Sequence, residues 1–270
     1  MSDARVGADE RADTGIHATA LIDPDAEIAD GVTVGPYSIL GPGVVVGSGT
    51  EIGPHVLVER NTILGEDCRI AKGAALGTDP QDLKFRGEDT TLEIGDRTVI
   101  REYATLNRGT AASGKTVVGS DCLLMAYTHV AHDCELGNHV IVSNAAQMAG
   151  HVLIEDWAIV SGLVAIHQFV RIGAHAFIGG GSRIPKDVPP YCRAVGNPDP
   201  KLFGLNIVGL DRRGLSPDVR KALKQAYRIL FQSGLNISQG LARAEAEVDP
   251  IPEVRYFIGF IRDSERGITI

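Results

Sequence analysis

An aliphatic residue or methionine fills 26 of the 29 positions that lie six residues apart between Ile16 and Ile184. The positions that interrupt the series are Asp82, Glu88 and Ala112. A period of six fits neither an α-helix nor a plain alternating strand, but it is typical of a short strand and a corner, repeated along a parallel β-helix. Few other folds accept this pattern, so the sequence predicts a mainly β protein with such a coil over residues 16–190.

A second series of small or β-branched residues lies four positions after each aliphatic one, as at Val44, Thr50 and Cys68. Side chains two apart on a strand share a face, so both series are expected to point into the coil. Glycine often follows the aliphatic residue, as at Gly47. This placement is consistent with a tight corner.

Two polar segments interrupt the repeat, near residues 77–93 (GTDPQDLKFRGEDTTLE) and 107–117 (NRGTAASGKTV). We interpret both as loops extruded from the coil. Loops mounted on a rigid repeat are common places for functional sites.

The two ends of the chain lack the repeat. Residues 1–15 are polar and charged, so we expect a disordered leader. Pro185, Pro189 and Pro190 are expected to end the coil, because proline lacks the N–H that a strand needs. Over 191–270 the period changes, and helix signals predict a small all-α C-terminal domain whose three helices lie near 216–232, 238–248 and 252–264.

Composition narrows the function. A net charge of −8 argues against general nucleic-acid binding, and no apolar run approaches the length of a membrane span. We therefore expect a cytoplasmic protein with no membrane insertion. Cys68, Cys122 and Cys134 occupy the small inward position, where we expect buried hydrophobic residues and not disulfides or metal ligands.

A column of histidines points to chemistry. Three six-residue sides make one turn, so residues 18 apart should stack, as His132, Gly150 and Gln168 would, with His151 and His167 beside them. An imidazole can take a proton from a hydroxyl or amine near neutral pH. A glycine one turn along can offer its backbone N–H to a developing oxyanion. Together these groups predict an acyl-transfer site.

The chemistry of this column leaves two questions. The Asp133 carboxylate could raise the basicity of His132, but neighbours on a strand point to opposite faces, so direct pairing requires a corner. Zinc is the competing interpretation, as in β-helix carbonic anhydrases, but the three-residue spacing of His129 and His132 does not match theirs. We therefore expect no metal and no cofactor.

Seven segments, in order and spacing, resemble one protein family. They are TLNRGT, GSDCLLMAYTHVAHDC, MAGHV, AIHQF, IGAHAFIGG, DVPPY and GLDRRG. They are similar to the UDP-N-acetylglucosamine acyltransferases that begin lipid A synthesis. The resemblance implies a left-handed parallel β-helix and a homotrimer with active sites between subunits. It also implies transfer of a 3-hydroxyacyl chain from acyl carrier protein to the 3-hydroxyl of UDP-N-acetylglucosamine.

The same resemblance implies roles for individual residues. His132 would be the general base, Asp133 its partner and Gly150 the oxyanion donor. The expected contacts to the sugar nucleotide and the donor arm are Asp82, Lys84, His129, His151, His167, Gln168, Asn206, Arg212 and Arg213. Phe177 and Gly180 fall where the family measures acyl chain length, and Gly180 would leave room for a longer tail.

Departures from the family's best-known members concern the acceptor. Asn107 replaces a histidine, Val208 stands where some members have glutamate, and Asp211 replaces a basic residue. Some relatives acylate the amine of a 3-amino sugar nucleotide, so N-acylation stays an alternative, as does a non-catalytic β-solenoid scaffold.

The partner protein suggests a further surface. Acyl carrier protein is acidic, so an acidic enzyme that binds it needs a concentrated basic face. Basic residues at helical spacing on the first C-terminal helix are candidates, namely Arg220, Lys221, Lys224 and Arg228. The alternative is a solvated helix face.

Overall fold

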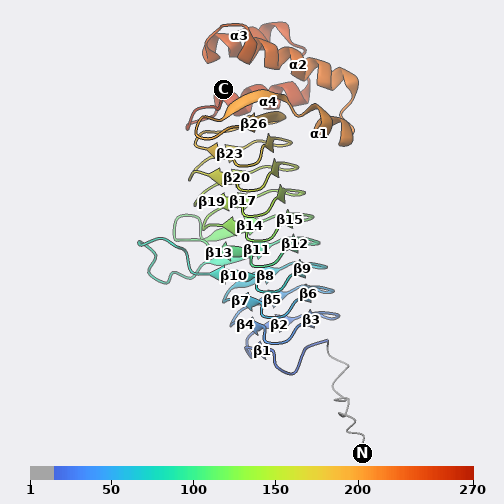
Figure 1. Ribbon diagram of the computed structural model, residues 1–270, viewed down its shortest axis with the longest axis vertical. Coiled ribbons are helices and arrows are strands. Elements are labelled where there is room, and N and C mark those ends of the chain that lie inside the picture. The colour runs from blue at the N-terminus through green and yellow to red at the C-terminus, as the bar shows by residue number, and fades with distance from the viewer. Residues whose placement is uncertain (1–14) are drawn as a thin grey trace, which may run out of the picture.

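The structure is a computed structural model that describes residues 15–270. From the N-terminal end the chain winds upward as a coil with three flat sides, and helices cover its far end (Figure 1). Each side is a stack of short strands, one strand per turn, and neighbours within the coil pair in parallel. The six-residue period therefore predicted the β-helix correctly. The expected leader falls, except for its last residue, outside the described residues.

We name the three sides sheets A, B and C. Sheet A contains β3 (Thr33–Val34), β6 (Glu51–Ile52), β9 (Arg69–Ile70), β12 (Val99–Ile100), β15 (Leu123–Leu124), β18 (Ile141–Val142), β21 (Ile159–Val160), β24 (Phe177–Ile178), β26 (Cys192–Val195) and β27 (Lys201–Leu205). Sheet B contains β1 (Leu21–Ile22), β4 (Ile39–Leu40), β7 (Leu57–Val58), β10 (Ala75–Thr78), β13 (Thr105–Asn107), β16 (His129–Val130), β19 (Gln147–Met148), β22 (Ala165–Ile166) and β25 (Arg183–Ile184). Sheet C contains β2 (Glu27–Ile28), β5 (Val45–Val46), β8 (Thr62–Leu64), β11 (Thr91–Ile94), β14 (Lys115–Val118), β17 (Glu135–Leu136), β20 (Leu153–Ile154) and β23 (Arg171–Ile172).

Both predicted inward series form the core of the coil. Leu76, Leu106 and Ile154 of the aliphatic series are fully buried, and so are Val44 and Thr50 of the small series. The polar members of the small series bond to backbone: the Thr50 hydroxyl donates to the Gly65 carbonyl oxygen at 2.8 Å. Apolar burial drives the coil to close, and these bonds satisfy the hydroxyl groups that it encloses.

The corners differ from the sequence prediction. The left-handed backbone conformation comes three residues after the aliphatic position and is mostly held by other residues, such as Tyr37 (φ 59°) and Asp133 (φ 59°). Apart from Gly77 (φ 72°), the glycines directly after the aliphatic residue have ordinary φ values. Their role is close packing, because a Cβ on Gly47 would lie 2.5 Å from the carbonyl carbon of Gly65 in the next turn.

Both extruded loops leave the coil at one edge, the B–C corner, where the chain passes from sheet B to sheet C. The first loop spans 79–90 between β10 and β11, and the second spans 108–114 between β13 and β14. Their bases are joined, since Asn107 Nδ2 donates to Thr78 Oγ1 at 2.8 Å and the buried Arg108 guanidinium pairs with Asp79. The two interruptions of the sequence therefore build one feature.

The coil continues past residue 190, which corrects the expected boundary. Val188 bridges to Ile172, and β26 pairs in parallel with β24. Pro190 is tolerated because it lies two residues after the inward Val188, a corner position that Pro36 and Pro54 also occupy. Prolines at that position leave the strand hydrogen bonds intact.

Four helices follow, one more than predicted. They are α1 (Ile207–Arg212), α2 (Pro217–Gln232), α3 (Ile237–Glu247) and α4 (Pro252–Arg262). At fewer than two turns, α1 is too short for a periodic pattern. The helices enclose a second core around Leu223, Phe257 and Leu210. Within residues 15–270, no helix combines the length and apolar character needed to cross a membrane.

Candidate active site

The predicted histidine column lies on the B–C corner, directly above the two loops. Parallel pairing aligns Val130 with Met148 and Met148 with Ile166, so the residues that follow them stack in the same order. The turns are tied together at the corner, because the His151 N–H donates to the His132 carbonyl oxygen at 3.1 Å. His132, Gly150 and Gln168 therefore form a column in the structure.

His132 and Asp133 make the direct contact that the sequence left open. His132 Nδ1 lies 2.7 Å from Asp133 Oδ2, and the Asp133 side chain is completely buried. The left-handed conformation of Asp133 turns the chain at this point. Two neighbours that would diverge on a strand can therefore pair at the corner.

The second loop holds the Asp133 carboxylate in place. The Thr110 N–H donates to Oδ1 at 2.9 Å, the Thr110 hydroxyl donates to Oδ2 at 2.7 Å, and the Ser113 hydroxyl also donates to Oδ1. Burial raises the pKa of Asp133, but the bonds from Ser113, His132 and Thr110 outweigh it and bring the pKa to about 2. Asp133 is thus an anion that orients His132.

Sequence reasoning missed Thr110 and Ser113. The extruded segment that carries them was identified, but the spacing does not show that it folds back onto the histidine column. The structure shows that this segment and the histidine column lie on the same B–C corner, which brings Thr110 and Ser113 to Asp133.

The His132 ring packs closely against Gly150, in the space that a side chain at position 150 would need. A Cβ at Gly150 would lie 2.5 Å from His132 Cε1 and 2.8 Å from Nε2. Within residues 15–270 the Gly150 N–H has no backbone acceptor. Pro36 and Pro54 occupy the equivalent corner position in other turns, so the coil does not need an N–H there. The Gly150 N–H therefore takes no part in the hydrogen bonds of the coil, and Gly150 lies beside the His132 ring.

His129 and His151 flank this pair. His129 lies on the outer face of sheet B, where its Nδ1 is 2.8 Å from Thr105 Oγ1 and burial lowers its pKa. The His151 ring meets His132 edge-on at 5.3 Å and stacks on Phe169 at 4.5 Å. His151 therefore contacts His132 directly, and His129 is close enough that the charge of His132 also lowers its pKa.

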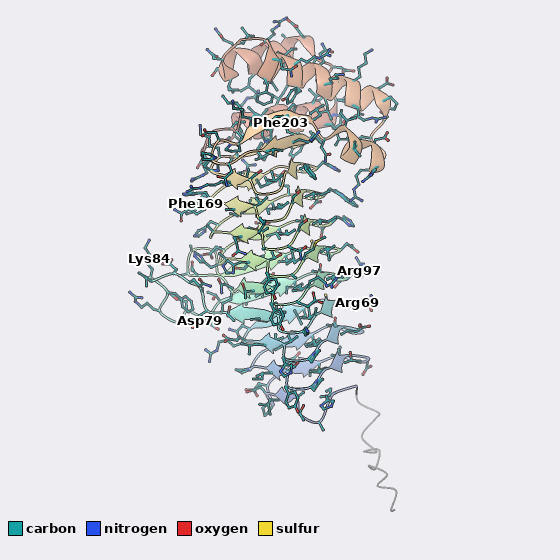
Figure 2. The ribbon with its side chains drawn as sticks, in the orientation of Figure 1. Arg69, Asp79, Lys84, Arg97, Phe169 and Phe203 are labelled. Carbon is teal, nitrogen blue, oxygen red and sulfur yellow. The ribbon has the colours of Figure 1, made fainter. Side chains whose placement is uncertain are left out.

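The next turn extends the site toward the C-terminus. His167 and Gln168 are exposed there, and Arg266, near the end of the chain, contacts His167. A hollow of about 480 Å³ is lined by His151, Phe169 and Arg266, among others. Figure 2 shows Phe169 and the loop residue Lys84 on the same edge of the coil.

A metal ion has one candidate group within the described residues. Ligand atoms of His132, Asp133 and His151 lie within 4.8 Å of one another. Ligand atoms at about 2.0–2.2 Å from one tetrahedral zinc ion lie about 3.4 Å apart. His132 Nδ1 is instead 2.7 Å from Asp133 Oδ2, the distance of a direct hydrogen bond, and both Asp133 oxygens also accept hydrogen bonds from Thr110. The donor set suits an oriented imidazole better than a metal ion.

The other predicted residues do not meet His132 within one chain. Asp82 and Lys84 belong to the loop 79–90, in which the Lys84 N–H donates to Asp82 Oδ1 at 2.9 Å, and Lys84 projects away from the coil (Figure 2). Phe177, Asn206 and Arg212 line a separate hollow of about 440 Å³ on sheet A.

Two further residues of the prediction occupy the remaining corners. The Arg213 guanidinium lies 4.0 Å from the centre of the Trp157 ring at the C–A corner. Gly180 lies at the A–B corner, where an added Cβ would first meet the Gly162 carbonyl oxygen at 3.4 Å. One chain thus carries two separate groups of predicted site residues: one on the B–C corner around His132, and one on sheet A and its two corners.

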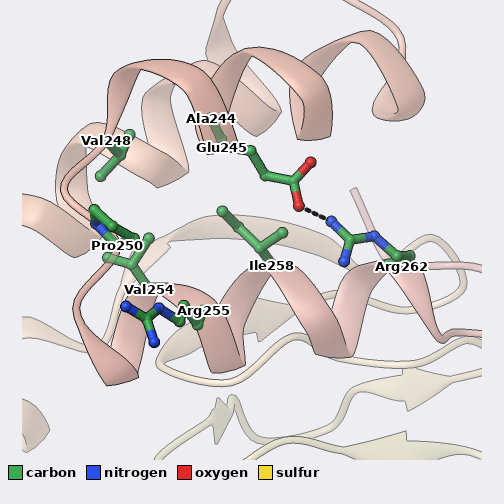
Figure 3. Close-up of a pocket in the computed structure, with 8 residues that line it drawn as sticks. All are labelled: Ala244, Glu245, Val248, Pro250, Val254, Arg255, Ile258 and Arg262. Atoms are coloured by element: carbon green, nitrogen blue, oxygen red, sulfur yellow. Dashed lines mark hydrogen bonds and ion pairs between the residues drawn. The ribbon is translucent and has the colours of Figure 1, made fainter.

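Another hollow, of about 400 Å³, lies between α3 and α4 (Figure 3). Val248, Val254 and Ile258 give it an apolar lining, and Glu245 pairs with Arg262 beside it. It contains none of the predicted site residues.

Comparisons with known proteins place the chain in a family. A family model described as Udp N-acetylglucosamine O-acyltransferase, Domain 2, matches residues 187–269, and one for six repeats of the bacterial transferase hexapeptide matches 13–48 and 115–150. The chain is 54% identical over 259 residues to the acyl-(acyl-carrier-protein)–UDP-N-acetylglucosamine O-acyltransferase of Paracidovorax citrulli, covering 94% of this chain and 98% of that relative. Identity to the enzyme of the same name from Myxococcus xanthus is 49% over 255 residues, covering 94% and 98%.

Solved structures give the same result. The UDP-N-acetylglucosamine acyltransferase of Bacteroides fragilis superposes with a TM-score of 0.92 at 46% identity, covering 94% of this chain and 99% of that one. The acyltransferase of Francisella novicida superposes with a TM-score of 0.90 at 37% identity, covering 94% and 93%.

Proposed function

The chain belongs to the UDP-N-acetylglucosamine O-acyltransferase family of hexapeptide-repeat proteins, and from this premise we propose how its B–C corner performs the reaction. The protein transfers an acyl group from acyl carrier protein to UDP-N-acetylglucosamine in lipid A biosynthesis. The acylated atom is thus an oxygen, and the alternatives of N-acylation and of a non-catalytic scaffold are set aside. The finer proposal is that a 3-hydroxyacyl chain passes to the 3-hydroxyl of the sugar.

His132 is the general base. Its Nδ1 donates to the ionised Asp133, so Nε2 carries the lone pair and faces the space left by Gly150. The single observation that carries this assignment is the 2.7 Å contact between His132 and the buried Asp133. A carboxylate held by Thr110 and Ser113 fixes the ring and stabilises the charge that it acquires.

The transfer needs one base and one oxyanion donor. His132 Nε2 takes the proton of the sugar hydroxyl while the hydroxyl oxygen attacks the thioester carbonyl carbon. The Gly150 N–H donates to the oxyanion that forms. When the carbon–sulfur bond breaks, the leaving thiolate takes the proton from His132, which restores the base. No covalent acyl-enzyme is required.

A second copy of the chain completes the site. Phe177, Asn206 and Arg212 lie on sheet A, away from His132, so the acyl pocket and the nucleotide contacts must come from a neighbouring subunit if they act on the same substrates. Exposed apolar residues mark a surface for that neighbour: Leu163 at the A–B corner is 72% exposed and Tyr127 is 60% exposed. We propose a homotrimer of left-handed coils, as the resemblance implies.

The donor protein binds near the C-terminal helices in this proposal. Lys221, Lys224 and Arg228 are exposed on α2, and Arg220 pairs with Asp211 at 2.6 Å. Within residues 15–270 these three cations form no ion pair, and three such charges on one helix suit an acidic partner. The cytoplasmic location stays part of the proposal.

Mass spectrometry of the products tests this function. The purified protein is incubated with UDP-N-acetylglucosamine and a series of 3-hydroxyacyl carrier proteins, and the 3-amino analogue of the sugar serves as the competing acceptor. The expected product is the 3-O-acyl sugar nucleotide. The variant His132→Ala should bind the nucleotide with unchanged affinity but lose turnover, whereas substantial turnover would exclude His132 as the base.

A further inference from the structure

The C-terminal tail, residues 263–270, is fixed against the turn of the coil that follows His167. The Asp187 N–H donates to the Gly267 carbonyl oxygen at 3.0 Å, and the Thr269 N–H donates to the Asp187 carbonyl oxygen at 2.8 Å. The Ser264 hydroxyl donates to the buried Asp187 Oδ2 at 2.7 Å. Bonds from both sides of Arg266 thus hold its backbone on the B–C corner.

The Arg266 side chain reaches from this tail to His167. Its Nε donates to the Pro185 carbonyl oxygen at 2.9 Å, and its Nη2 lies 2.8 Å from His167 Nδ1. A guanidinium has no lone pair to offer, so His167 Nδ1 must be the acceptor. His167 then carries its hydrogen on Nε2, at the opposite side of the ring.

A second contact at the same nitrogen is weaker. His167 Nδ1 also lies 3.2 Å from the Gln168 carbonyl oxygen, which can only accept. One nitrogen cannot donate to that oxygen and accept from Arg266 in the same tautomer. The shorter contact, with the group that can only donate, determines the tautomer.

Two further features favour the contact of Arg266 with His167. Within residues 15–270 its guanidinium forms no ion pair with a carboxylate. The side chain is half-buried and lines the hollow that also contains His151 and Phe169. His167 Nε2 has no partner within the same residues, so its N–H remains available to a ligand.

We propose that Arg266 is a positioning residue for the acyl transfer: it holds His167 in the tautomer that donates through Nε2 to a bound substrate. This inference rests on the proposed function, in which His167 lines the substrate site. Arg266 itself touches no substrate in this scheme and acts through His167.

A double-mutant cycle tests the proposal. The variants Arg266→Gln, His167→Gln and the double variant are compared by steady-state kinetics with both substrates. Arg266→Gln is expected to lower kcat/KM roughly tenfold, the effect of losing one hydrogen bond to a charged group, and to raise the KM of the same substrate as His167→Gln. In the His167→Gln background, removing Arg266 is expected to have no further effect.

The control separates positioning from anchoring of the tail. Ser264→Ala removes another bond of the tail, to Asp187, without touching His167. It is expected to keep the wild-type KM and kcat. An equal rise in KM for Ser264→Ala would overturn the proposal, as would losses that multiply in the double variant.

The experiment also distinguishes an error in the placement of His167 from an error in the role of Arg266. A His167→Gln variant with wild-type kinetics would contradict the placement of His167 in the substrate site, and the role of Arg266 with it. A defective His167→Gln with a normal Arg266→Gln would overturn only the role of Arg266. Long-range ¹H–¹⁵N spectra of ¹⁵N-histidine protein add a direct measurement: the His167 signals should report hydrogen on Nε2, and Arg266→Gln should shift them while Ser264→Ala leaves them in place.

Discussion

Replacing Gly150 by alanine is expected to impair catalysis far more than folding. The backbone at Gly150 has an ordinary φ, so alanine can adopt it. The added Cβ, however, would lie 2.5 Å from His132 Cε1, which is 0.9 Å short of the 3.4 Å where ordinary contact begins. The three atoms nearest to this Cβ all belong to the His132 ring, so the ring must move.

The size of this shift sets the expected loss. A displacement of about 1 Å in a catalytic group can cost roughly 100-fold in rate, which corresponds to about 2.7 kcal/mol. The backbone N–H of residue 150 is retained in Gly150→Ala, so the loss reports on the position of His132. Overpacking against a movable ring should cost only about 1 kcal/mol of folding stability, or roughly 2–4 °C in Tm.

Steady-state kinetics and thermal unfolding measure the two effects. Gly259→Ala is the control, because Gly259 lies in α4, outside the predicted site residues, and an added Cβ there would meet nothing within 4 Å. We expect wild-type kcat/KM for Gly259→Ala and unchanged nucleotide affinity for both variants. If Gly150→Ala keeps more than about a third of the wild-type kcat/KM, the proposed geometry of base and glycine is wrong.

Other predictions follow from the same contacts. Asp133→Asn should lower kcat roughly 10³-fold, because the orienting anion is lost. Since hydrogen bonds hold the pKa of Asp133 at about 2, below its ordinary 3.8, its ionised form adds stability above pH 4 that disappears as the pH falls through 2; urea unfolding of wild type and Asp133→Asn should diverge by up to about 2 kcal/mol across that range. Ser113→Ala removes one bond to this carboxylate and should lower the unfolding free energy by about 1.5–3 kcal/mol in the same assay. Gly47→Ala forces a Cβ against the backbone of Gly65 and should lower the free energy of unfolding by about 1–3 kcal/mol. In α4, the Cβ of Gly259→Ala meets nothing within 4 Å, so this variant should keep the wild-type free energy of unfolding.

The sequence predicts the coil well because one period controls both packing and register. Each inward slot recurs at the same phase, so stacking of His132 on Gly150 follows from counting. The pairing of His132 with Asp133 needed one more fact, the left-handed corner at Asp133. No residue type announces that corner, since tyrosine, aspartate and histidine all occupy it in this chain.

Contacts between distant segments were beyond sequence reasoning. Thr110 reaches Asp133 across 23 positions, and Arg266 reaches His167 across 99. Such contacts depend on where a loop or tail folds back, which no periodic pattern records. The helix α1 was missed for a local reason, because six residues are too few to show a period.

Parallel pairing also limits how such a site can change. Neighbouring strands in a sheet lie about 4.8 Å apart, so groups on one corner are spaced in whole multiples of that distance. His132 and Gly150 are one strand spacing apart, and Gln168 is two from His132. Inserting or deleting a complete 18-residue turn would move every group beyond it by one such increment and keep the others in register. Relatives that accept longer or shorter substrates can therefore differ in two ways: in discrete increments of coil length, or in fine adjustments of the side chains that fill the spaces between turns.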